Sequence, residues 1–351
     1  MKIMKDIKDI IEQYFDDNIS IEDLQREFFL RFMRNIEYVF GLKVGLCEYN
    51  KLRGVLALNH ICEQKDIFNW AFHVTDYSHP SSPCIYITLH LGCYEEIGIY
   101  LVRKGNKVCI PVTERVFMQE TKHYYINLAK RGINSSQIVF VNIESNTGFR
   151  KMIRYAQKGY SLLCYIDGNS GIGGMTRNDL KLEKIHFFNT TIHVRKGIEY
   201  LDRILNREII PIYSCIEEIS SQPQIVLLPS INKKQNGTLT EKIWNTFSRI
   251  IWQYYWQWEV WLYIDEFIVQ SHSKVQSSGY VLNTHRYFPL IKSGVYYFYD
   301  KQTNNLIKVS QRLFKLLSNL EKYSICSYDK LLAYIPKETL VNDLLVKKII
   351  I

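Results

Sequence analysis

The sequence predicts an α/β protein with a mainly parallel sheet flanked by helices, followed by a small C-terminal domain. Two observations carry this prediction. From Cys84 to about residue 230, short apolar runs typical of buried strands alternate with longer amphipathic runs typical of helices, and such alternation produces a parallel sheet covered on both faces. After residue 280, a hairpin-like stretch precedes three short helical stretches. A chain of 351 residues can bury one large core and a smaller second one.

Apolar runs bounded by turn residues mark the strands, and amphipathic runs between them mark the helices. We expect strands at 84–89, 107–112, 137–142, 160–166, 208–217 and 224–230, and helices at 94–104, 116–131, 146–158 and 239–258. Gly132 and Gly159 follow two of these helices, where a helix commonly ends. The Gly- and Asn-rich piece 168–192 interrupts the alternation.

The N-terminal segment, residues 1–50, is expected to be helical. Leu24, Phe28, Phe32, Ile36 and Phe40 recur at i, i+4 spacing and form one apolar stripe. Such a stripe packs on a core, or it lies at a membrane surface with its phenylalanines in the bilayer. Both interpretations remain open from the sequence.

The polar stretch 270–279 predicts a domain boundary. Behind it, VYYFYDKQTNNLIKVS is typical of a hairpin around Asn304-Asn305, and QRLFKLLSNL, SYDKLLAYI and ETLVNDLLVKKII are typical of short helices. These are the parts of a winged-helix domain. The predicted organisation is therefore a helical segment at 1–50, an α/β domain at 51–270 and a winged-helix domain at 280–351.

Composition narrows the possible partners and the compartment. A net charge of +9 suits an anionic membrane surface, an acidic carrier protein or nucleic acid. The eight cysteines show no metal-binding spacing, and several lie inside apolar runs, which indicates a reducing cytoplasm. No run approaches the roughly eighteen apolar residues of a membrane span, so any membrane contact would be peripheral.

The stretch TLHLGCYEE (88–96) carries the strongest chemical signal, because His90 stands where a buried strand ends and a helix begins. The positive end of that helix favours the neutral imidazole that a general base needs. Glu95 could accept the other ring N–H and fix the tautomer, with Glu96 as its competitor. Asp167 also ends a predicted strand, at the edge of the sheet where ligands bind.

Several other chemistries lack their motifs. The chain has no HExxH, GxxxxGK[ST], GxGxxG or GxSxG, which disfavours zinc hydrolysis, nucleotide-driven phosphoryl transfer, a dinucleotide fold and a serine hydrolase. The remaining candidate is a histidine base paired with a carboxylate.

HLGCYEE (90–96) resembles the HxxxxD/E motif of glycerolipid-type acyltransferases. Three further blocks are similar to the LpxL/HtrB-like family of lipid A biosynthesis acyltransferases. They are RKMIRYAQKGYSLLCYIDGNSG (150–171), HFFNTTIHVRKGIEYLDRILNREIIPIYS (186–214) and the closing block WQWEVW (256–261). The chain departs from the family pattern at Asn189, where a glycine is usual, and begins without the usual membrane-spanning helix.

The resemblance implies an acyl transfer from an acyl carrier protein or coenzyme A thioester, with His90 as base and Glu95 steadying the imidazolium. It requires no metal or other cofactor. The residues expected to bind acceptor or carrier, or to shape the site, are Glu96, Arg115, Arg150, Asp167, Asn169 and Arg195.

The C-terminal stretch RYFPLIKSGVYYFYDKQTNNLIKVSQRLFKLLSNL resembles the PqqD-like domains that accompany enzymes maturing ribosomal peptides. Such domains take a leader peptide as an added strand, so a precursor peptide becomes a possible acceptor.

Three alternatives remain. The chain could acylate a glycolipid such as lipid A, with the C-terminal domain as a structural cap. It could be an acyltransferase fold without activity, used as a scaffold. It could also be a peptide- or DNA-binding winged-helix protein; since the basic residues are scattered over all three C-terminal helices, we expect no nucleic acid partner.

Overall fold

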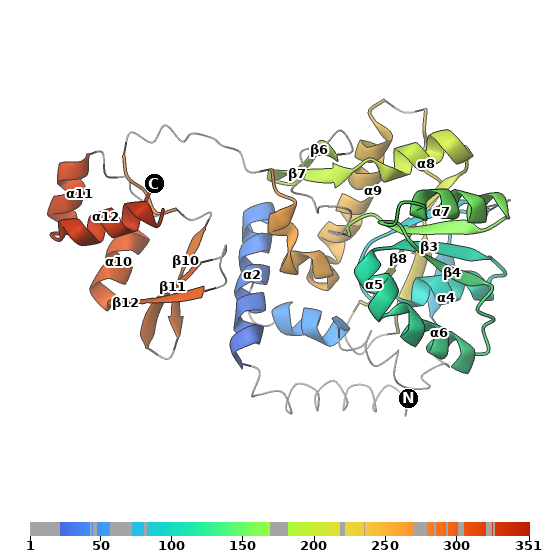
Figure 1. Cartoon of the computed structure of the whole chain (residues 1–351), viewed down its shortest axis with the longest axis horizontal. Helices are drawn as coiled ribbons and strands as arrows, with labels where there is room; N and C mark the ends of the chain where they lie inside the picture. Colours follow the sequence, from blue (N-terminus) through green and yellow to red (C-terminus); the bar gives the residue numbers. More distant parts are fainter. Residues whose placement is uncertain are drawn as a thin grey trace. The chain divides into compact units, whose positions relative to one another are not determined.

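The computed structural model describes residues 22–42, 44, 48–56, 72–80, 83–168, 182–217, 222–234, 236–269, 279–283, 286–292, 294–300, 305–320, 325 and 327–351. The chain forms two compact units, Met1–Val269 and Gln270–Ile351 (Figure 1). The boundary falls at the start of the polar stretch singled out in the sequence.

The first unit is built on a seven-stranded sheet with the order β1-β9-β8-β2-β5-β3-β4. Its strands are β1 (His73–Asp76), β2 (Ile85–Thr88), β3 (Val108–Val112), β4 (Ile138–Asn142), β5 (Ser161–Tyr165), β8 (Ile209–Cys215) and β9 (Gln224–Leu227). Strands β8, β2, β5, β3 and β4 run parallel, and β9 is antiparallel to β8. The predicted α/β class with a mainly parallel sheet is confirmed.

The named helices in the described part of this unit are α2 (Glu22–Phe40), α4 (Glu96–Arg103), α5 (Glu114–Gln119), α6 (Thr121–Lys130), α7 (Gly148–Gln157), α8 (Gly197–Leu205) and α9 (Leu239–Gln253), and residues 48–56 are also helical. The expected helix 116–131 is two helices, and Thr113 caps the first of them. The expected helix 239–258 ends at Gln253 and continues as three 3₁₀ turns, η2 (Tyr255–Gln257), η3 (Glu259–Leu262) and η4 (Ile264–Glu266).

A two-stranded hairpin of β6 (Leu182–Phe187) and β7 (Thr190–Arg195) was not expected. It begins inside the piece that interrupts the strand–helix alternation. Its side chains alternate in burial along both strands, with Ile185 and Phe187 buried on β6 and Ile192 and Val194 on β7. This alternation anchors the hairpin to the core through one face.

Both faces of the sheet are covered, because successive strand residues point to opposite sides. On β2, Ile85 and Ile87 join one core cluster, which also receives α2 and α9. Tyr86 joins the other, with Ile97 of α4 and Leu128 of α6.

Helix α2 packs its apolar stripe into the core of the first unit. Phe32 and Ile36 are fully buried and Phe40 nearly so, whereas Phe28 is exposed. The Asn35 side chain donates a 2.7 Å hydrogen bond to the Trp261 carbonyl. The N-terminal helix therefore shares a core with the sheet, as the first of the two interpretations expected; the side chain of Leu24 lies outside the described residues.

The second unit has a three-stranded antiparallel sheet and three helices. Its strands, in sheet order, are β10 (Tyr287–Lys292), β11 (Val295–Asp300) and β12 (Asn305–Val309), and its helices are α10 (Gln311–Asn319), α11 (Tyr328–Tyr334) and α12 (Glu338–Val346). The hairpin of β11 and β12 and the three helices match the prediction; strand β10 was not expected. Phe298, Leu317, Leu331 and Leu344 form the core, and Asn304 lies outside the described residues.

At Gly92, the loop that bears His90 passes close to the backbone of β8 at Ser214. Its φ of +59° is a left-handed conformation, and a Cβ at this position would lie 2.6 Å from the carbonyl oxygen of Ser214 on β8. A backbone atom this close has nowhere to move, so only glycine is accommodated.

Replacing Gly92 with alanine should lower the free energy of unfolding by about 3 kcal/mol or more, through backbone strain together with the clash. Gly132→Ala is the matched control, because Gly132 has a φ of +68° but nothing within 4 Å of its Cβ position; it should cost about 1 kcal/mol. Urea denaturation of both variants measures the difference. Equal losses would show that the contact with Ser214 carries no cost.

Candidate functional site

The register of the sheet brings His90 and Asp167 together. Strands β2 and β5 are parallel neighbours in which Thr88 pairs with Tyr165. His90 and Asp167 each lie two residues further along their own strands. The carboxyl ends of neighbouring parallel strands meet at one edge of the sheet, where ligands of open α/β sheets bind.

Asp167 is a buried carboxylate, 1% exposed, that accepts three hydrogen bonds. Its Oδ2 accepts from the backbone N–H of His90 at 2.8 Å and from the indole N–H of Trp258 at 2.7 Å, and its Oδ1 accepts from Nδ1 of His90 at 2.8 Å. Three donors from two segments offset the cost of burying the charge.

This pairing fixes the tautomer of His90. A carboxylate only accepts hydrogen bonds, so Nδ1 carries the proton and, in the neutral ring, Nε2 keeps its lone pair. Within the described part of the chain, Nε2 of His90 has no hydrogen-bond partner. With the side chain 25% exposed, this nitrogen has the chemistry of a general base.

The charges around His90 favour its protonated form. Burial lowers the pKa of His90, but the charge and hydrogen bond of Asp167, followed by the charges of Glu259 and Glu120, raise it to a net value above the usual 6.5. The sequence argument expected the helix dipole to favour the neutral ring. The nearby carboxylates outweigh that effect.

Two tyrosines hold the imidazole in place. The rings of Tyr94 and Tyr165 each lie 4.8 Å from the His90 ring, centroid to centroid. Both phenols are engaged, because Tyr94 donates to Glu259 at 2.9 Å and Tyr165 donates to the Tyr94 carbonyl at 3.0 Å. The ring can therefore turn little away from Asp167.

The segment Gln257–Glu259 connects the ends of three strands. The buried Gln257 side chain accepts from the backbone N–H of Ile216, just after β8, and donates to its carbonyl. Trp258 donates to Asp167 after β5, and the backbone N–H of Glu259 donates to the His90 carbonyl after β2 at 3.0 Å. Three consecutive residues thus fix the edge at which the site lies.

The carboxylate that His90 contacts through Nδ1 is Asp167, whereas the sequence analysis expected Glu95. Glu95 lies one position before α4, and its backbone carbonyl accepts a hydrogen bond from Tyr124 at 3.4 Å. Both oxygens of its competitor Glu96 accept at 2.8 Å from Nη1 of Arg131, the residue that follows α6. The physical reason is the register of β2 and β5, which local spacing does not reveal.

The other expected site residues are dispersed. Arg115, on α5, is exposed and donates to Gln119 at 3.3 Å, and Arg150 lies on the exposed side of α7. Arg195 ends β7, opposite Leu182. Asn169 lies outside the described residues.

Two side chains around the pair of His90 and Asp167, those of Glu259 and Tyr263, were not predicted individually from the sequence. Glu259 accepts from Tyr94, and the Tyr263 phenol lies near enough to Asp167 and Glu259 that their charges, added to burial, raise the pKa of Tyr263 well above its usual value. The sequence did point to this segment. Glu259 lies inside the WQWEVW run that resembles the closing block, and Tyr263 lies two residues after it.

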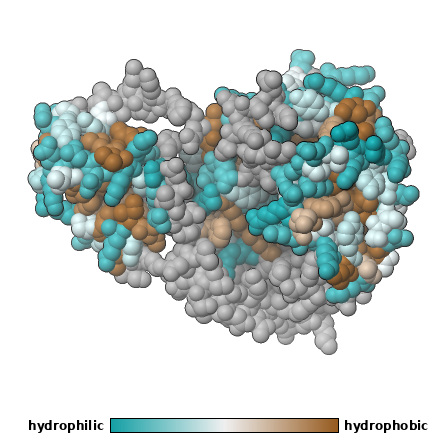
Figure 2. Space-filling view, in the orientation of Figure 1, coloured by the Kyte–Doolittle hydropathy of each residue, from teal (hydrophilic) through white to brown (hydrophobic). Residues whose placement is uncertain are grey.

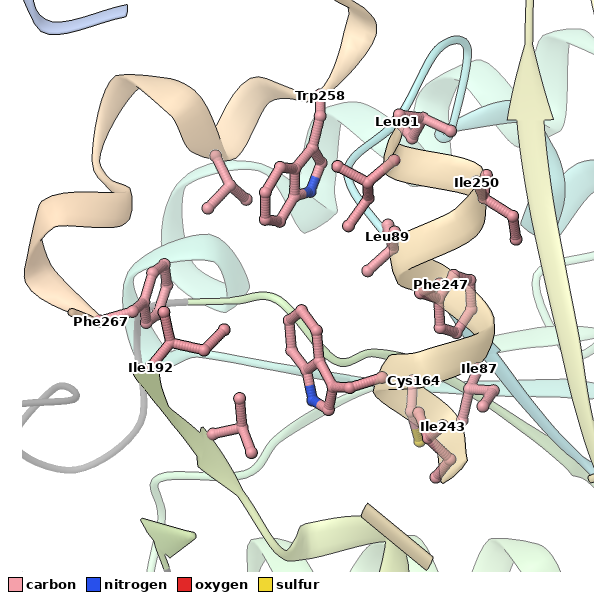
Figure 3. Close-up of a cluster of buried hydrophobic side chains, with 14 of the residues drawn as sticks. Ile87, Leu89, Leu91, Cys164, Ile192, Ile243, Phe247, Ile250, Trp258 and Phe267 are labelled. Carbon is pink, nitrogen blue, oxygen red and sulfur yellow. The ribbon is translucent and has the colours of Figure 1, made fainter. Parts of the chain in front are cut away.

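An apolar cluster adjoins the carboxyl edge of the sheet that carries His90 (Figure 3). Leu89 and Leu91, on either side of His90, are fully buried in it. Phe247 and Ile250 of α9, Ile192 of β7 and Trp258 belong to the same cluster and are among the residues labelled in Figure 3. The polar pair of His90 and Asp167 therefore borders a large hydrocarbon region.

No family model matches this sequence, and no curated protein does. Among the described residues, no helix is both long and apolar enough to cross a membrane. Nor do histidine, cysteine and acidic side chains in the described ranges gather in a group that could hold a metal ion.

Removing the carboxylate should change the titration of His90. In Asp167→Asn the charge that raises the pKa is lost, so the pKa of His90, followed by NMR of the imidazole signals, should fall by about one unit or more. Glu120→Gln, which removes a smaller contribution, should lower it less. An unchanged pKa in Asp167→Asn would contradict the geometry.

Proposed function

We propose that this protein is an acyltransferase that moves an acyl group from a thioester of coenzyme A or an acyl carrier protein to an amine or hydroxyl. The observation that carries the proposal is the pair of His90 and Asp167. In this pair Nδ1 of His90 is bonded to Asp167, and Nε2 of His90 keeps its lone pair at the carboxyl edge of a parallel sheet, next to an apolar cluster. The resemblance of four sequence blocks to LpxL/HtrB-like acyltransferases points in the same direction.

The proposed reaction uses His90 first as base and then as acid. Nε2 takes the proton of the acceptor hydroxyl or amine as the acceptor atom attacks the thioester carbonyl. The tetrahedral intermediate collapses, the carbon–sulfur bond breaks, and the leaving thiolate takes the proton from the imidazolium. Asp167 stabilises the imidazolium between these steps, a role that the sequence analysis gave to Glu95.

The apolar cluster supports an acyl rather than a polar donor group. Leu89 and Leu91, the chain neighbours of His90, are fully buried members of this cluster, so the loop that bears His90 is anchored in hydrocarbon. An acyl chain that reached this region would gain about 0.8 kcal/mol for each methylene that leaves water.

The second unit favours a peptide as acceptor over a glycolipid. Strand β12 is the last strand of its sheet, and its Leu306 and Lys308 are exposed. An edge strand with unpaired backbone groups can take up an extended peptide as a further strand. We propose a winged-helix, PqqD-like role for this unit, which would deliver a precursor peptide for acylation.

His90→Ala should lower the acyl-transfer rate by about 10²–10⁴-fold, and Asp167→Asn should also slow it severely. Intact mass spectrometry of candidate acceptors, mixed with the protein and a panel of acyl thioesters, measures the transfer. Glu95→Gln is the matched control and should be much milder. Retained turnover in His90→Ala would refute the mechanism, and a loss confined to Glu95→Gln would restore the assignment made from the sequence.

The wild-type rate should increase as the pH rises through the pKa of His90 and then level off, because the base works only when its ring is neutral. Since that pKa lies above 6.5 in the folded protein, the midpoint should also lie above 6.5.

Removing residues 270–351 separates the two acceptor classes. If a precursor peptide is the acceptor, its acylation should fall strongly while transfer to a small amine persists. If a glycolipid is acylated at the same rate with and without the second unit, the unit serves only as a structural cap and the peptide proposal is wrong.

A further inference from the structure

A cavity lies beside the edge strand β4, three strands from the strand that leads to His90. It is a cleft of about 500 Å³ along the edge strand β4, within the roughly 300–1,000 Å³ typical of small-molecule sites. Its residues come from α5, from β4 and the turn after it, and from α7. They are Phe117, Phe140, Val141, Asn142, Ser145, Lys151, Arg154, Tyr155 and Lys158.

The basic side chains of the cleft come from a single helix face. Lys151, Arg154 and Lys158 follow one another at i, i+3 and i+7 on α7 and its C-terminal end, so they point to one side. All three are exposed, and in the ranges that the structure describes none of them lies within ion-pair distance of a carboxylate. Figure 2 shows a mainly hydrophilic surface over this helix.

Partly exposed aromatic rings complete the cleft. Phe117, Phe140 and Tyr155 contribute flat apolar surfaces, and the amide of Asn142 and the hydroxyl of Ser145 add polar groups at the carboxyl end of β4. Cations beside aromatic rings are the chemistry that binds a phosphorylated nucleotide, since the base stacks on a ring and the phosphates meet the cations.

The cleft and the catalytic edge share helix α5. Phe117 of α5 lines the cleft, and Glu120, which follows the helix, lies close enough to His90 for its charge to act on the imidazole. In the sheet, β4 is three strands from β2, a distance of about 14 Å at the usual strand spacing. A ligand with a long flexible arm could occupy both places.

We propose that the α7 cleft binds the phosphorylated adenine nucleotide of coenzyme A, and thereby selects coenzyme A as the thioester donor. The proposal rests on the acyltransferase function proposed above. The 3′-phosphate and the diphosphate would meet Lys151, Arg154 and Lys158, and the pantetheine arm would run along the carboxyl edge of the sheet to His90. A concave site with aromatic walls suits a planar base better than the convex face of a carrier protein.

Binding without turnover tests the cleft directly. Isothermal titration calorimetry with coenzyme A and with adenosine 3′,5′-bisphosphate, at low ionic strength, should show binding to the wild-type protein. Arg154→Glu should weaken it by about tenfold or more, since hydrogen bonds to charged groups are the strong ones. Arg150→Glu is the matched control, because Arg150 lies on the same helix, is exposed and does not line the cleft; it should change affinity far less.

The outcomes separate this proposal from the acyltransferase proposal. If Arg150→Glu and Arg154→Glu weaken nucleotide binding equally, the anion is attracted to the basic helix in general, and the proposal that the cleft is the nucleotide site is refuted. No binding of either nucleotide, with acyl transfer from an acyl carrier protein intact, would also overturn it and leave the acyltransferase in place. If the protein binds the nucleotide through Arg154 but has no transferase activity, the proposed nucleotide site is supported and the proposed acyl transfer is refuted.

Discussion

The hydrogen bonds accepted by the Asp167 carboxylate are the interactions on which the candidate site depends. The carboxylate is buried, and it binds the backbone and the ring of His90 together with the indole of Trp258. A buried carboxylate with a missing donor would carry a large desolvation cost, so each of these contacts requires the others. The same three bonds set the tautomer of His90 and hold its ring, which joins the stability of this site to its chemistry.

The 3₁₀ segment after α9 completes the arrangement that Asp167 begins. Gln257, Trp258 and Glu259 bond in turn to the chain beyond β8, β5 and β2, which are neighbours in the sheet. The close approach of Gly92 to Ser214 packs the loop that bears His90 against β8. The polar pair lies beside a hydrocarbon cluster, and these bonds from the 3₁₀ segment hold the strand ends around it in place.

Much of the fold could be predicted from the sequence, because buried strands such as CIYI and SLLCYI are apolar runs bounded by turn residues. Strand β1 was missed because HVTD is short and half polar, and β6 and β7 were missed although Ile185, Phe187, Ile192 and Val194 alternate with polar residues as strand residues do. His90 and Asp167 were both predicted from their places at strand ends. Their pairing was not predicted, since β3 and β4 lie between β2 and β5 in the chain, and only the strand order makes Asp167 the neighbour of His90. Glu95, close in sequence, was the nearer choice on local spacing alone.

The most direct test of this account is the position of the proton on His90. ¹⁵N NMR of the imidazole in the wild-type protein, at a pH above the pKa of His90, distinguishes the two neutral tautomers. The account predicts a ring protonated at Nδ1, held by Asp167, with Nε2 unprotonated and able to act as a base. A ring protonated at Nε2 would leave no base facing the acceptor, and would contradict both the pairing and the mechanism built on it.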